Sequence, residues 1–369
     1  MKIFVNYLKN YGKTKDTAIH YPKNITRICE YVSNIQTEVN HSRIQPIIQK
    51  LIKRIKATRF SNWFQAIPHD VVYIPVSQVK DYDLVFNSYI YPKYLGLGHI
   101  PPNILRINYQ TDRVLISRDI KNLKERRNLI SKRWTSFDAV ITTTNFSVPL
   151  IQQECSSLAS KIYYCPNFLP DARVISSEKF QEKVKDNLIK ILFVGRDGFR
   201  KGLKELILAL SKLELECKKK IDLTIISETE FDDNLLKDIK FQFFKSASNS
   251  GVLDYMEKAH IFCLPTKSEA YGIVFVEAMS KGCAIISDND LPRLELIKSN
   301  QCGICVDPEN ITQIKNALKQ LILDQKLRET YMENSLKTFE SEYSPKIVAQ
   351  KHKQIFQEVI NESNQSNVH

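Results

Sequence analysis

The sequence predicts an α/β protein with two doubly wound parallel sheets, and three observations lead to this class. Short apolar runs alternate with amphipathic segments of helix length, as in βαβ units. The chain has 369 residues, which suits two domains of ordinary size, and 43% hydrophobic residues, which is enough for packed cores. Its 10 glycines and 14 prolines are too few for a fibrous or linker-dominated chain.

The amino-terminal half predicts a first domain over residues 1–170. Short apolar runs predict strands at Lys2–Asn6, Val71–Pro75, Leu84–Asn87, Asn103–Asn108 and Ala139–Thr142, and a helix is expected over Asn122–Trp134. The polar stretch Asn167–Asn187 contains Pro170 and is the expected boundary.

The carboxy-terminal half alternates more clearly and predicts a second domain over residues 188–345. Strands are expected at Ile189–Val194, Ile221–Ser227, Ala259–Leu264, Cys283–Ser287 and Gly303–Val306. Helices are expected at Gly202–Leu213, Val252–Lys258, Ile273–Lys281 and Ile311–Leu323, the last with Asn310 as its N-cap. A final helix over residues 346–360 is expected to pack back toward the first domain, and Asn361–His369 to fray.

Charge and cysteine usage narrow the partners and the compartment. The 53 Lys and Arg residues against 41 Asp and Glu give a net charge of +12, which favours an anionic partner. The 8 cysteines are scattered among apolar neighbours, as expected for reduced, buried thiols in a cytoplasmic protein. Cys302-Gly-Ile-Cys305 has no second pair, so it predicts a turn rather than a zinc or redox site. We expect neither a signal peptide nor a membrane-spanning segment.

A basic segment at residues 42–64 has two interpretations. Six Lys and Arg residues occur between positions 39 and 69 with no acidic residue, and isoleucines and a leucine recur at helical spacing from Ile44 to Ile55. The apolar stripe can pack in the core of the first domain. Alternatively, the helix lies on an anionic membrane and delivers a lipid-linked acceptor, which would place the protein peripherally on the inner face of the cell membrane.

A glycine-rich, basic segment follows the strand Ile189–Val194 and opens a helix. It reads Gly195-Arg196-Asp197-Gly198-Phe199-Arg200-Lys201-Gly202. Glycine lets the backbone approach an anion, and a helix N-terminus supplies N–H groups and positive partial charge. Arg196 and Lys201 add full charges, so the segment predicts a diphosphate site. The alternative is an ordinary turn with solvated basic residues.

A second segment, Glu269-Ala-Tyr-Gly-Ile-Val-Phe-Val-Glu277, follows the strand that ends at Leu264. The N–H groups of Gly272 and Ile273 are expected to point at a phosphate. Glu277, one turn into the helix, could hold vicinal hydroxyls, as acidic residues hold ribose in dinucleotide folds. The alternative is that one glutamate complements the helix dipole and the other is solvated.

These motifs together resemble family 4 glycosyltransferases, which have the GT-B fold of two Rossmann-like domains facing a central cleft. The similarity covers roughly residues 160–360 and is faint before them. The Gly-Arg-x4-Lys-Gly pattern of that family is matched by Gly195, Arg196, Lys201 and Gly202, and its Glu-x7-Glu pattern by Glu269 and Glu277 with Tyr271-Gly272 between them. Its Glu-Ala-Met triplet with a following glycine is matched by Glu277-Ala278-Met279 and Gly282. Two shorter segments, Cys165-Pro166-Asn167 and Asp307-Pro308, also resemble family positions.

The resemblance implies a retaining transfer of a sugar from a UDP- or GDP-sugar to a glycan or lipid-linked acceptor, in cell-surface polysaccharide or glycolipid assembly. It implies that Arg196 and Lys201 stabilise the departing diphosphate and that Glu269 holds donor-sugar hydroxyls, as the catalytic residues. The implied donor-binding residues are Gly195, Tyr271, Gly272, Ile273 and Glu277. The first domain would bind the acceptor, through residues that the sequence does not identify.

The sequence departs from the family pattern at three places. The loop Asn6–Lys13 has a single glycine, Gly12, where many members are glycine-rich. Asn108 or Tyr109 stands where many members have a histidine, and His20, His69 and His99 are expected to be surface or packing residues. The glycines usual after Cys283–Ser287 are absent from Asp288-Asn-Asp-Leu-Pro292.

No metal cofactor is expected. Asp81-Tyr-Asp83 and Asp288-Asn-Asp290 could each hold Mg²⁺ or Mn²⁺ against a diphosphate, but loop carboxylates are the simpler interpretation. One rival function is a sugar-nucleotide epimerase or hydrolase on the same scaffold. The other is a basic nucleic-acid-binding protein, which no RRM, KH, zinc-finger or helix-turn-helix signature supports, so we expect no nucleic-acid partner.

Overall fold

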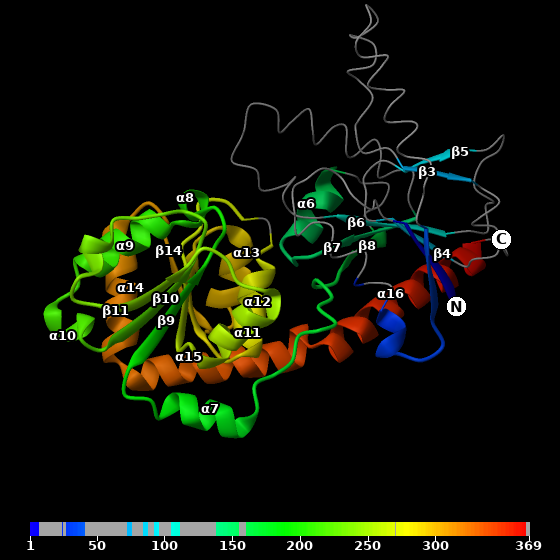
Figure 1. Ribbon diagram of the computed structural model, residues 1–369. Coiled ribbons are helices and arrows are strands. Elements are labelled where there is room, and N and C mark those ends of the chain that lie inside the picture. Colours follow the sequence, from blue (N-terminus) through cyan, green and yellow to red (C-terminus); the bar gives the residue numbers. More distant parts are fainter. Residues whose placement is uncertain are drawn as a thin grey trace, which may run out of the picture. The chain divides into compact units, whose positions relative to one another are not determined.

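The structure is a computed structural model, and it describes residues 1–6, 24, 27–40, 72–75, 84–87, 92–95, 105–110, 138–154, 160–269 and 271–366. The chain divides into two compact units (Figure 1). Unit 1 comprises Met1–Pro170 and Pro345–His369, and unit 2 comprises Asp171–Ser344. Each unit contains a parallel sheet, which confirms the predicted α/β class.

Unit 1 contains a six-stranded parallel sheet in the order β2-β1-β4-β6-β7-β8. Its strands are β1 (Lys2–Asn6), β2 (Gln36–Asn40), β4 (Leu84–Asn87), β6 (Leu105–Gln110), β7 (Ala139–Thr142) and β8 (Ile162–Tyr164). The strand predicted at Val71–Pro75 is β3 (Val72–Pro75), which pairs with β5 (Pro92–Leu95) in a separate two-stranded sheet. The predicted helix Asn122–Trp134 and the basic segment 42–64 lie outside the described residues.

The final helix, α16 (Pro345–Ser366), packs in the core of unit 1, together with η2 (Ile28–Glu30). Val348, Phe356 and Val359 on α16 are buried with Ile141 on β7 and with Phe168. The helix extends to Ser366, so the expected fraying of residues 361–366 is wrong. The described part of unit 1 also contains the helix α6 (Ser147–Glu154).

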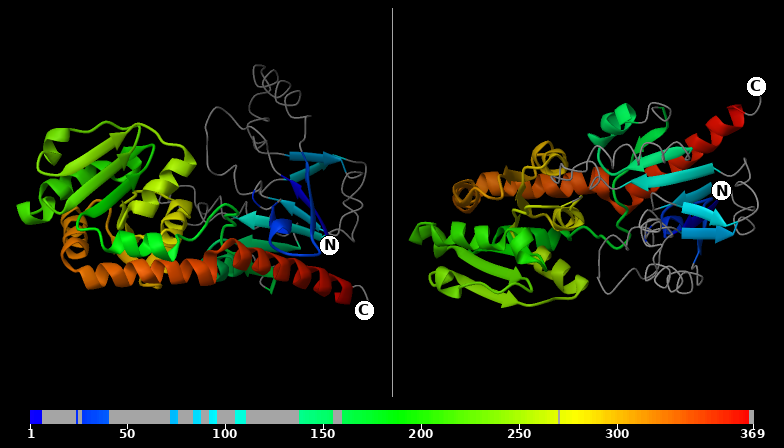
Figure 2. Two further views of the ribbon diagram at one scale, coloured as in Figure 1. Left: turned by 60° about the horizontal axis from the view of Figure 1, so that its bottom comes forward. Right: turned by 90° about the horizontal axis from the view of Figure 1, so that it is seen from above.

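Unit 2 contains a second six-stranded parallel sheet, in the order β11-β10-β9-β12-β13-β14. The strands are β9 (Ile189–Val194), β10 (Ile221–Ile226), β11 (Lys240–Phe244), β12 (Ile261–Leu264), β13 (Ala284–Asp288) and β14 (Gly303–Val306). Helices cover both faces (Figures 1 and 2), which explains why β12 and β13 are buried along their whole length and read as continuous apolar runs.

The helices of unit 2 that come after β9 follow the strands in βαβ order. They are α8 (Gly198–Lys201), α9 (Leu203–Ser211), α10 (Leu215–Lys218), η6 (Asp233–Leu236), α11 (Asn249–Lys258), α12 (Ile273–Ser280), α13 (Leu291–Arg293), η7 (Leu294–Lys298), α14 (Ile311–Leu323), α15 (Gln325–Thr338) and η8 (Phe339–Tyr343). Asn310 caps α14, as predicted, because its side chain accepts a hydrogen bond from the Gln313 N–H. Among the described helices, none is both long enough and apolar enough to cross a membrane.

Unit 2 begins at Asp171, earlier than the predicted residue 188, because the intervening helix α7 (Ser177–Val184) packs on it. Phe180 of α7 is buried. The buried ammonium of Lys183 donates hydrogen bonds to the carbonyls of Lys281, at 2.8 Å, and Gly282, at 3.0 Å. These contacts satisfy a charge that would be costly to bury alone.

Candidate functional site

Two glycines shape the turn after β9. A Cβ at Gly195 would lie 2.8 Å from Cβ and Cγ of Lys201, so the glycine makes room for the Lys201 side chain. Gly202 has φ of +81°, and a Cβ there would lie 2.1 Å from the carbonyl oxygen of Pro265. Only glycine fits such a left-handed position in backbone contact. The turn therefore lies directly against the end of β12.

The loop after β12 is attached to this turn by hydrogen bonds to its main chain. The Lys267 N–H donates to the Arg200 carbonyl at 2.9 Å. In return, Arg200 Nη1 donates to the Ser268 carbonyl at 2.7 Å. Arg200 was not predicted as a site residue. Its guanidinium also pairs with Asp197, with Nε 3.4 Å from Oδ2, and its contacts to the loop hold Lys201 and Glu269 near each other.

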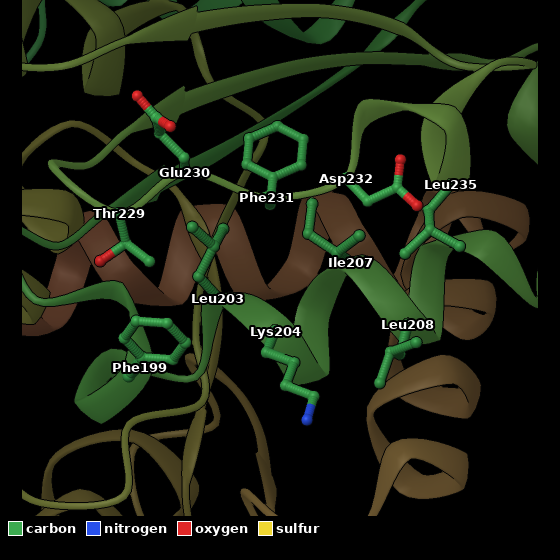
Figure 3. A pocket seen from close by; sticks show the side chains of 10 residues that line it. All are labelled: Phe199, Leu203, Lys204, Ile207, Leu208, Thr229, Glu230, Phe231, Asp232 and Leu235. Carbon is green, nitrogen blue, oxygen red and sulfur yellow. The ribbon is translucent and has the colours of Figure 1, made fainter.

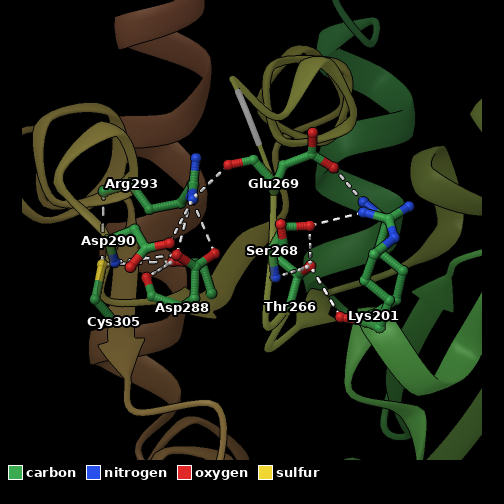
Figure 4. A network of polar contacts seen from close by, with 10 residues as sticks. Lys201, Thr266, Ser268, Glu269, Asp288, Asp290, Arg293 and Cys305 are labelled. Carbon is green, nitrogen blue, oxygen red and sulfur yellow. Dashed lines mark hydrogen bonds and ion pairs between the residues drawn. The ribbon is translucent and has the colours of Figure 1, made fainter. Parts of the chain in front are cut away.

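Lys201 and Glu269 form an ion pair between Nζ and Oε2 (Figure 4). Their side chains are 11% and 21% exposed, so water screens the pair only in part. The predicted cation and the predicted carboxylate are thus in direct contact at the carboxyl edge of the sheet. Ligands of doubly wound sheets bind at this edge.

Arg196 lies at the same edge of the sheet but is paired differently. Its Nε is 3.2 Å from Oε1 of Glu228, which follows β10, and the two side chains are 57% and 61% exposed. The structure therefore does not bring Arg196 into the Lys201–Glu269 pair. An exposed pair of this kind is weak, so the guanidinium is available to another anion.

The N-terminus of α12 carries the other predicted donor-binding residues. Gly272 is its N-cap, with φ of +87°, and a Cβ there would lie 2.5 Å from Cδ2 of Phe275. The N–H groups at the start of a helix have no partner within the helix, so they can bind an anion. Ile273, the first helical residue, is half-buried, and Tyr271 is buried beside it.

Glu277 lies one turn into α12 and is half-buried. Burial raises the pKa of its carboxyl to about 7. Among the described residues, the carboxylate has no hydrogen bond or ion pair that offsets this cost. A carboxylate kept in such a place is unfavourable for folding, and it suits a group that accepts hydrogen bonds from a ligand.

Arg293 is a residue of this region that sequence reasoning missed. Its side chain is 0% exposed, and Nε lies 3.0 and 2.9 Å from the two carboxylate oxygens of Asp288. Nη2 lies 3.3 Å from Asp290 Oδ2 and donates to the Glu269 carbonyl at 3.0 Å (Figure 4). The signal in the sequence that could have pointed to it is its place three residues after the Asp288-Asn-Asp290 triplet.

The described residues offer no cluster of His, Cys, Asp and Glu side chains suited to a metal ion. The carboxylates of Asp288 and Asp290 bind Arg293 instead. Cys302 and Cys305 have separate partners, since their sulfur atoms contact Thr338 Oγ1 and Ser287 Oγ. Asp81 and Asp83 lie outside the described residues, as do His20, His69 and His99.

A separate pocket of about 230 Å³ lies between α8, α9 and the residues that follow β10 (Figure 3). No predicted site residue lines it. The lining is largely apolar and consists of Phe199, Leu203, Lys204, Ile207, Leu208, Thr229, Glu230, Phe231, Asp232 and Leu235. The pocket is therefore distinct from the Lys201–Glu269 pair. For the acceptor, Asn108 and Tyr109 are described as backbone of β6 only.

Solved glycosyltransferases share the fold over almost the whole chain. Alr3699/HepE from Anabaena, in complex with UDP, has a TM-score of 0.63 at 13% identity, over 97% of this chain and 99% of that one. WaaG, a glycosyltransferase involved in lipopolysaccharide biosynthesis, has a TM-score of 0.57 at 16% identity, over 96% of this chain and 98% of its own. The chain is therefore an α/β protein of the GT-B class.

The sequence of unit 2 is similar to a known family. Residues 174–338 match the family Glycosyl transferases group 1. CapM of Staphylococcus aureus, a capsular polysaccharide biosynthesis glycosyltransferase, is 25% identical over 193 residues, half of each chain. The phosphatidyl-myo-inositol mannosyltransferase of Mycobacterium leprae is 30% identical over 151 residues, 38% of this chain and 39% of that protein. These sequence matches span half or less of each relative.

Proposed function

We propose that the chain is a retaining glycosyltransferase that transfers a sugar from a UDP- or GDP-sugar to a glycan or lipid-linked acceptor. The observation that carries the proposal is the Lys201–Glu269 pair, which lies at the carboxyl edge of a parallel sheet and beside the glycine-capped start of α12. This arrangement offers a cation, free helix N–H groups and carboxylates to one ligand. A nucleotide-sugar has a diphosphate, which suits the cation and the N–H groups. The diphosphate lies between two groups that carry hydroxyls, which suit the carboxylates.

Each residue then has a distinct task. Lys201, joined by Arg196, binds the diphosphate, and the N–H groups of Gly272 and Ile273 bind its oxygens. Glu269 accepts hydrogen bonds from sugar hydroxyls, and Glu277 from the ribose. Tyr271 and Gly195 shape the surroundings of these groups.

The reaction needs positive charge at the leaving group. The bond between the anomeric carbon and the diphosphate oxygen breaks, the acceptor oxygen bonds to that carbon on the same face, and the acceptor proton passes to the departing diphosphate oxygen. The transition state resembles an oxocarbenium ion, while negative charge grows on the departing diphosphate. Preorganised cations at that oxygen lower the barrier by several kcal/mol.

Lysine and arginine can neutralise the diphosphate, so we propose that no metal cofactor is required. Activity that is lost in EDTA and restored by Mn²⁺ would contradict this part. Analysis of the anomeric configuration of the product by NMR tests retention.

The acceptor proposal follows from the relatives. CapM is named for capsular polysaccharide, and a further relative from Campylobacter jejuni, 28% identical over 167 residues, is named for a diphospho-undecaprenol acceptor. We therefore propose a cytoplasmic enzyme of cell-surface polysaccharide or glycolipid assembly. Residues 42–64 are proposed to contact the anionic inner face of the cell membrane, and flotation with anionic vesicles tests that contact.

A thermal-shift panel of UDP, GDP, ADP and their sugars is the direct test. A ligand at 100 times its Kd stabilises the folded protein by about 2.7 kcal/mol. Stabilisation by one nucleotide and its sugar, followed by transfer only when an acceptor is added, supports the proposal. Turnover without an acceptor would favour an epimerase or hydrolase, and no stabilisation by any nucleotide would refute the donor site.

A further inference from the structure

We propose that Arg293 is a positioning residue, which fixes the backbone at Glu269 and so sets where the Glu269 carboxylate meets the donor sugar. The proposal rests on the proposed function of Glu269. Arg293 is 0% exposed, so it does not itself touch the donor. It acts through the hydrogen bond from Nη2 to the Glu269 carbonyl, at 3.0 Å.

Contacts of the guanidinium with two carboxylates fix the direction of that hydrogen bond. Both carboxylate oxygens of Asp288 lie within 3.0 Å of Arg293 Nε, and Oδ2 of Asp290 lies 3.3 Å from Nη2. A guanidinium is planar, so holding one edge orients the N–H groups of the other. Asp288 ends β13, a strand that is buried along its length, and this gives the arginine a rigid base.

Glu269 is consequently held at two points (Figure 4). Its carboxylate pairs with Lys201, which follows β9, and its carbonyl accepts from Arg293, which follows β13. Glu269 lies in the loop that follows β12, and β12 lies between β9 and β13 in the sheet. Arg293 thus joins the ends of β13 and β12 directly, and Glu269 extends the link to the end of β9 through its pair with Lys201.

A role in stability alone explains the cluster poorly. The desolvation cost of a buried ion pair offsets much of its Coulomb energy, and apolar residues of the same volume often stabilise as well. The charged cluster instead fixes the direction of the hydrogen bond from Arg293 to the Glu269 carbonyl.

The test is the double variant Asp288→Asn/Arg293→Met, which removes both charges and leaves neither buried alone. The ligands are the nucleoside diphosphate, and its sugar, that stabilise the wild-type protein in the thermal-shift panel. We expect the Kd of the nucleoside diphosphate to stay within about twofold and kcat to fall about 100-fold, the effect of a misplaced catalytic group. Hydrogen exchange of the amides in 266–269 should rise at least about tenfold, with the strands of unit 2 unchanged.

Arg328→Met is the matched control. Arg328 is also buried in unit 2, but its Nη1 donates to the carbonyls of Leu321 and Ile322, away from the site. This variant should lose stability and keep kcat. If the double variant does not fold, Asp290→Asn replaces it, with a fall in kcat of about three- to tenfold expected.

Unchanged kcat and unchanged exchange at 266–269 would overturn the proposal. A uniform rise in exchange across unit 2, with kcat and nucleotide affinity falling together, would also overturn it, because that pattern marks a structural role only. If the wild-type protein binds no nucleotide-sugar, the proposed function fails instead. The exchange experiment then still decides whether Arg293 orders the loop.

Discussion

Lys201 and Glu269 neutralise each other across two strand ends, one after β9 and the other after β12. In the absence of a ligand, the cation proposed for the diphosphate is therefore occupied by the carboxylate proposed for the sugar. Under the proposed function, we expect a nucleotide-sugar to replace this contact with two others, phosphate on Lys201 and hydroxyls on Glu269. A nucleoside diphosphate would supply only the first, so the sugar should contribute to affinity by giving Glu269 new partners.

Lys201→Ala and Glu269→Ala should each lower kcat/KM about 10²- to 10³-fold, because each removes a preorganised group at the reacting centre. The protein should still fold, but the Tm should fall somewhat, because each substitution leaves the partner's charge part-buried and without its ion pair. Lys204→Ala is the control, as Lys204 is an exposed lysine of the adjacent helix α9. Wild-type rates in either site variant would remove this site assignment.

Glu228→Gln should tighten the binding of a nucleotide-sugar about two- to fivefold at low salt. The substitution removes the carboxylate that now pairs with Arg196 at 3.2 Å and leaves the guanidinium to the diphosphate. The gain should vanish at high salt, because both side chains are exposed. Glu230→Gln is the control, since Glu230 pairs with Lys245 at 2.8 Å and is also well exposed. Calorimetry that shows no difference between the two variants would argue against Arg196 as a phosphate ligand.

Much of the sheet architecture could be predicted, and the misses share a physical cause. Five strands, β1, β4, β7, β9 and β14, agree with prediction to the residue, because short apolar runs with polar ends define them. The strands missed from the six-stranded sheets are β2, β8 and β11, and each is the outermost strand of its sheet. An edge strand buries less surface, so its sequence need not be apolar.

The features of the site also divide into those that the sequence predicts and those that it does not. The glycines and charges of Gly195–Gly202 and of Glu269–Glu277 are local patterns, and the sequence alone places them after strands. Arg293 has no local pattern that links it to Glu269, because that hydrogen bond joins residues 24 positions apart. The pairing of Arg196 with Glu228 likewise depends on the adjacency of β9 and β10.

Gly195→Ala should separate an effect on the site from an effect on folding. The added Cβ would meet Cβ and Cγ of Lys201 at 2.8 Å, and a flexible side chain can move away. We expect kcat/KM to fall at least about tenfold with a nearly unchanged Tm. In Gly202→Ala the Cβ would meet the Pro265 carbonyl at 2.1 Å with φ of +81°, so the backbone must move, and the loss should be about 1–3 kcal/mol of stability or more. Equal Tm losses in both variants would contradict this distinction.

Glu277→Gln should stabilise the ligand-free protein above neutral pH. The carboxyl has a pKa of about 7 in the folded protein against 4.5 ordinarily, so between these values the unfolded chain loses a proton that the folded protein keeps. The free energy of unfolding of the wild-type protein therefore falls as pH rises through this window. The variant should be more stable by about 1–3 kcal/mol at pH 8 and similar at pH 4. Urea unfolding at both pH values measures this, with the exposed Glu333→Gln as control.

Donor binding should depend on pH through the same carboxyl. Ribose hydroxyls donate to the ionised form, and with a pKa of about 7 only about a tenth of the protein is ionised at pH 6. The Kd for a nucleotide-sugar should therefore be about tenfold weaker at pH 6 than at pH 8. A nucleotide-sugar is the right probe, because its diphosphate is a diester and keeps its charge across this range. Glu277→Gln should bind more weakly than the wild-type protein at pH 8 and show no such slope. The same slope in the variant would mean that another group titrates, and Glu277 would lose its assignment to the ribose.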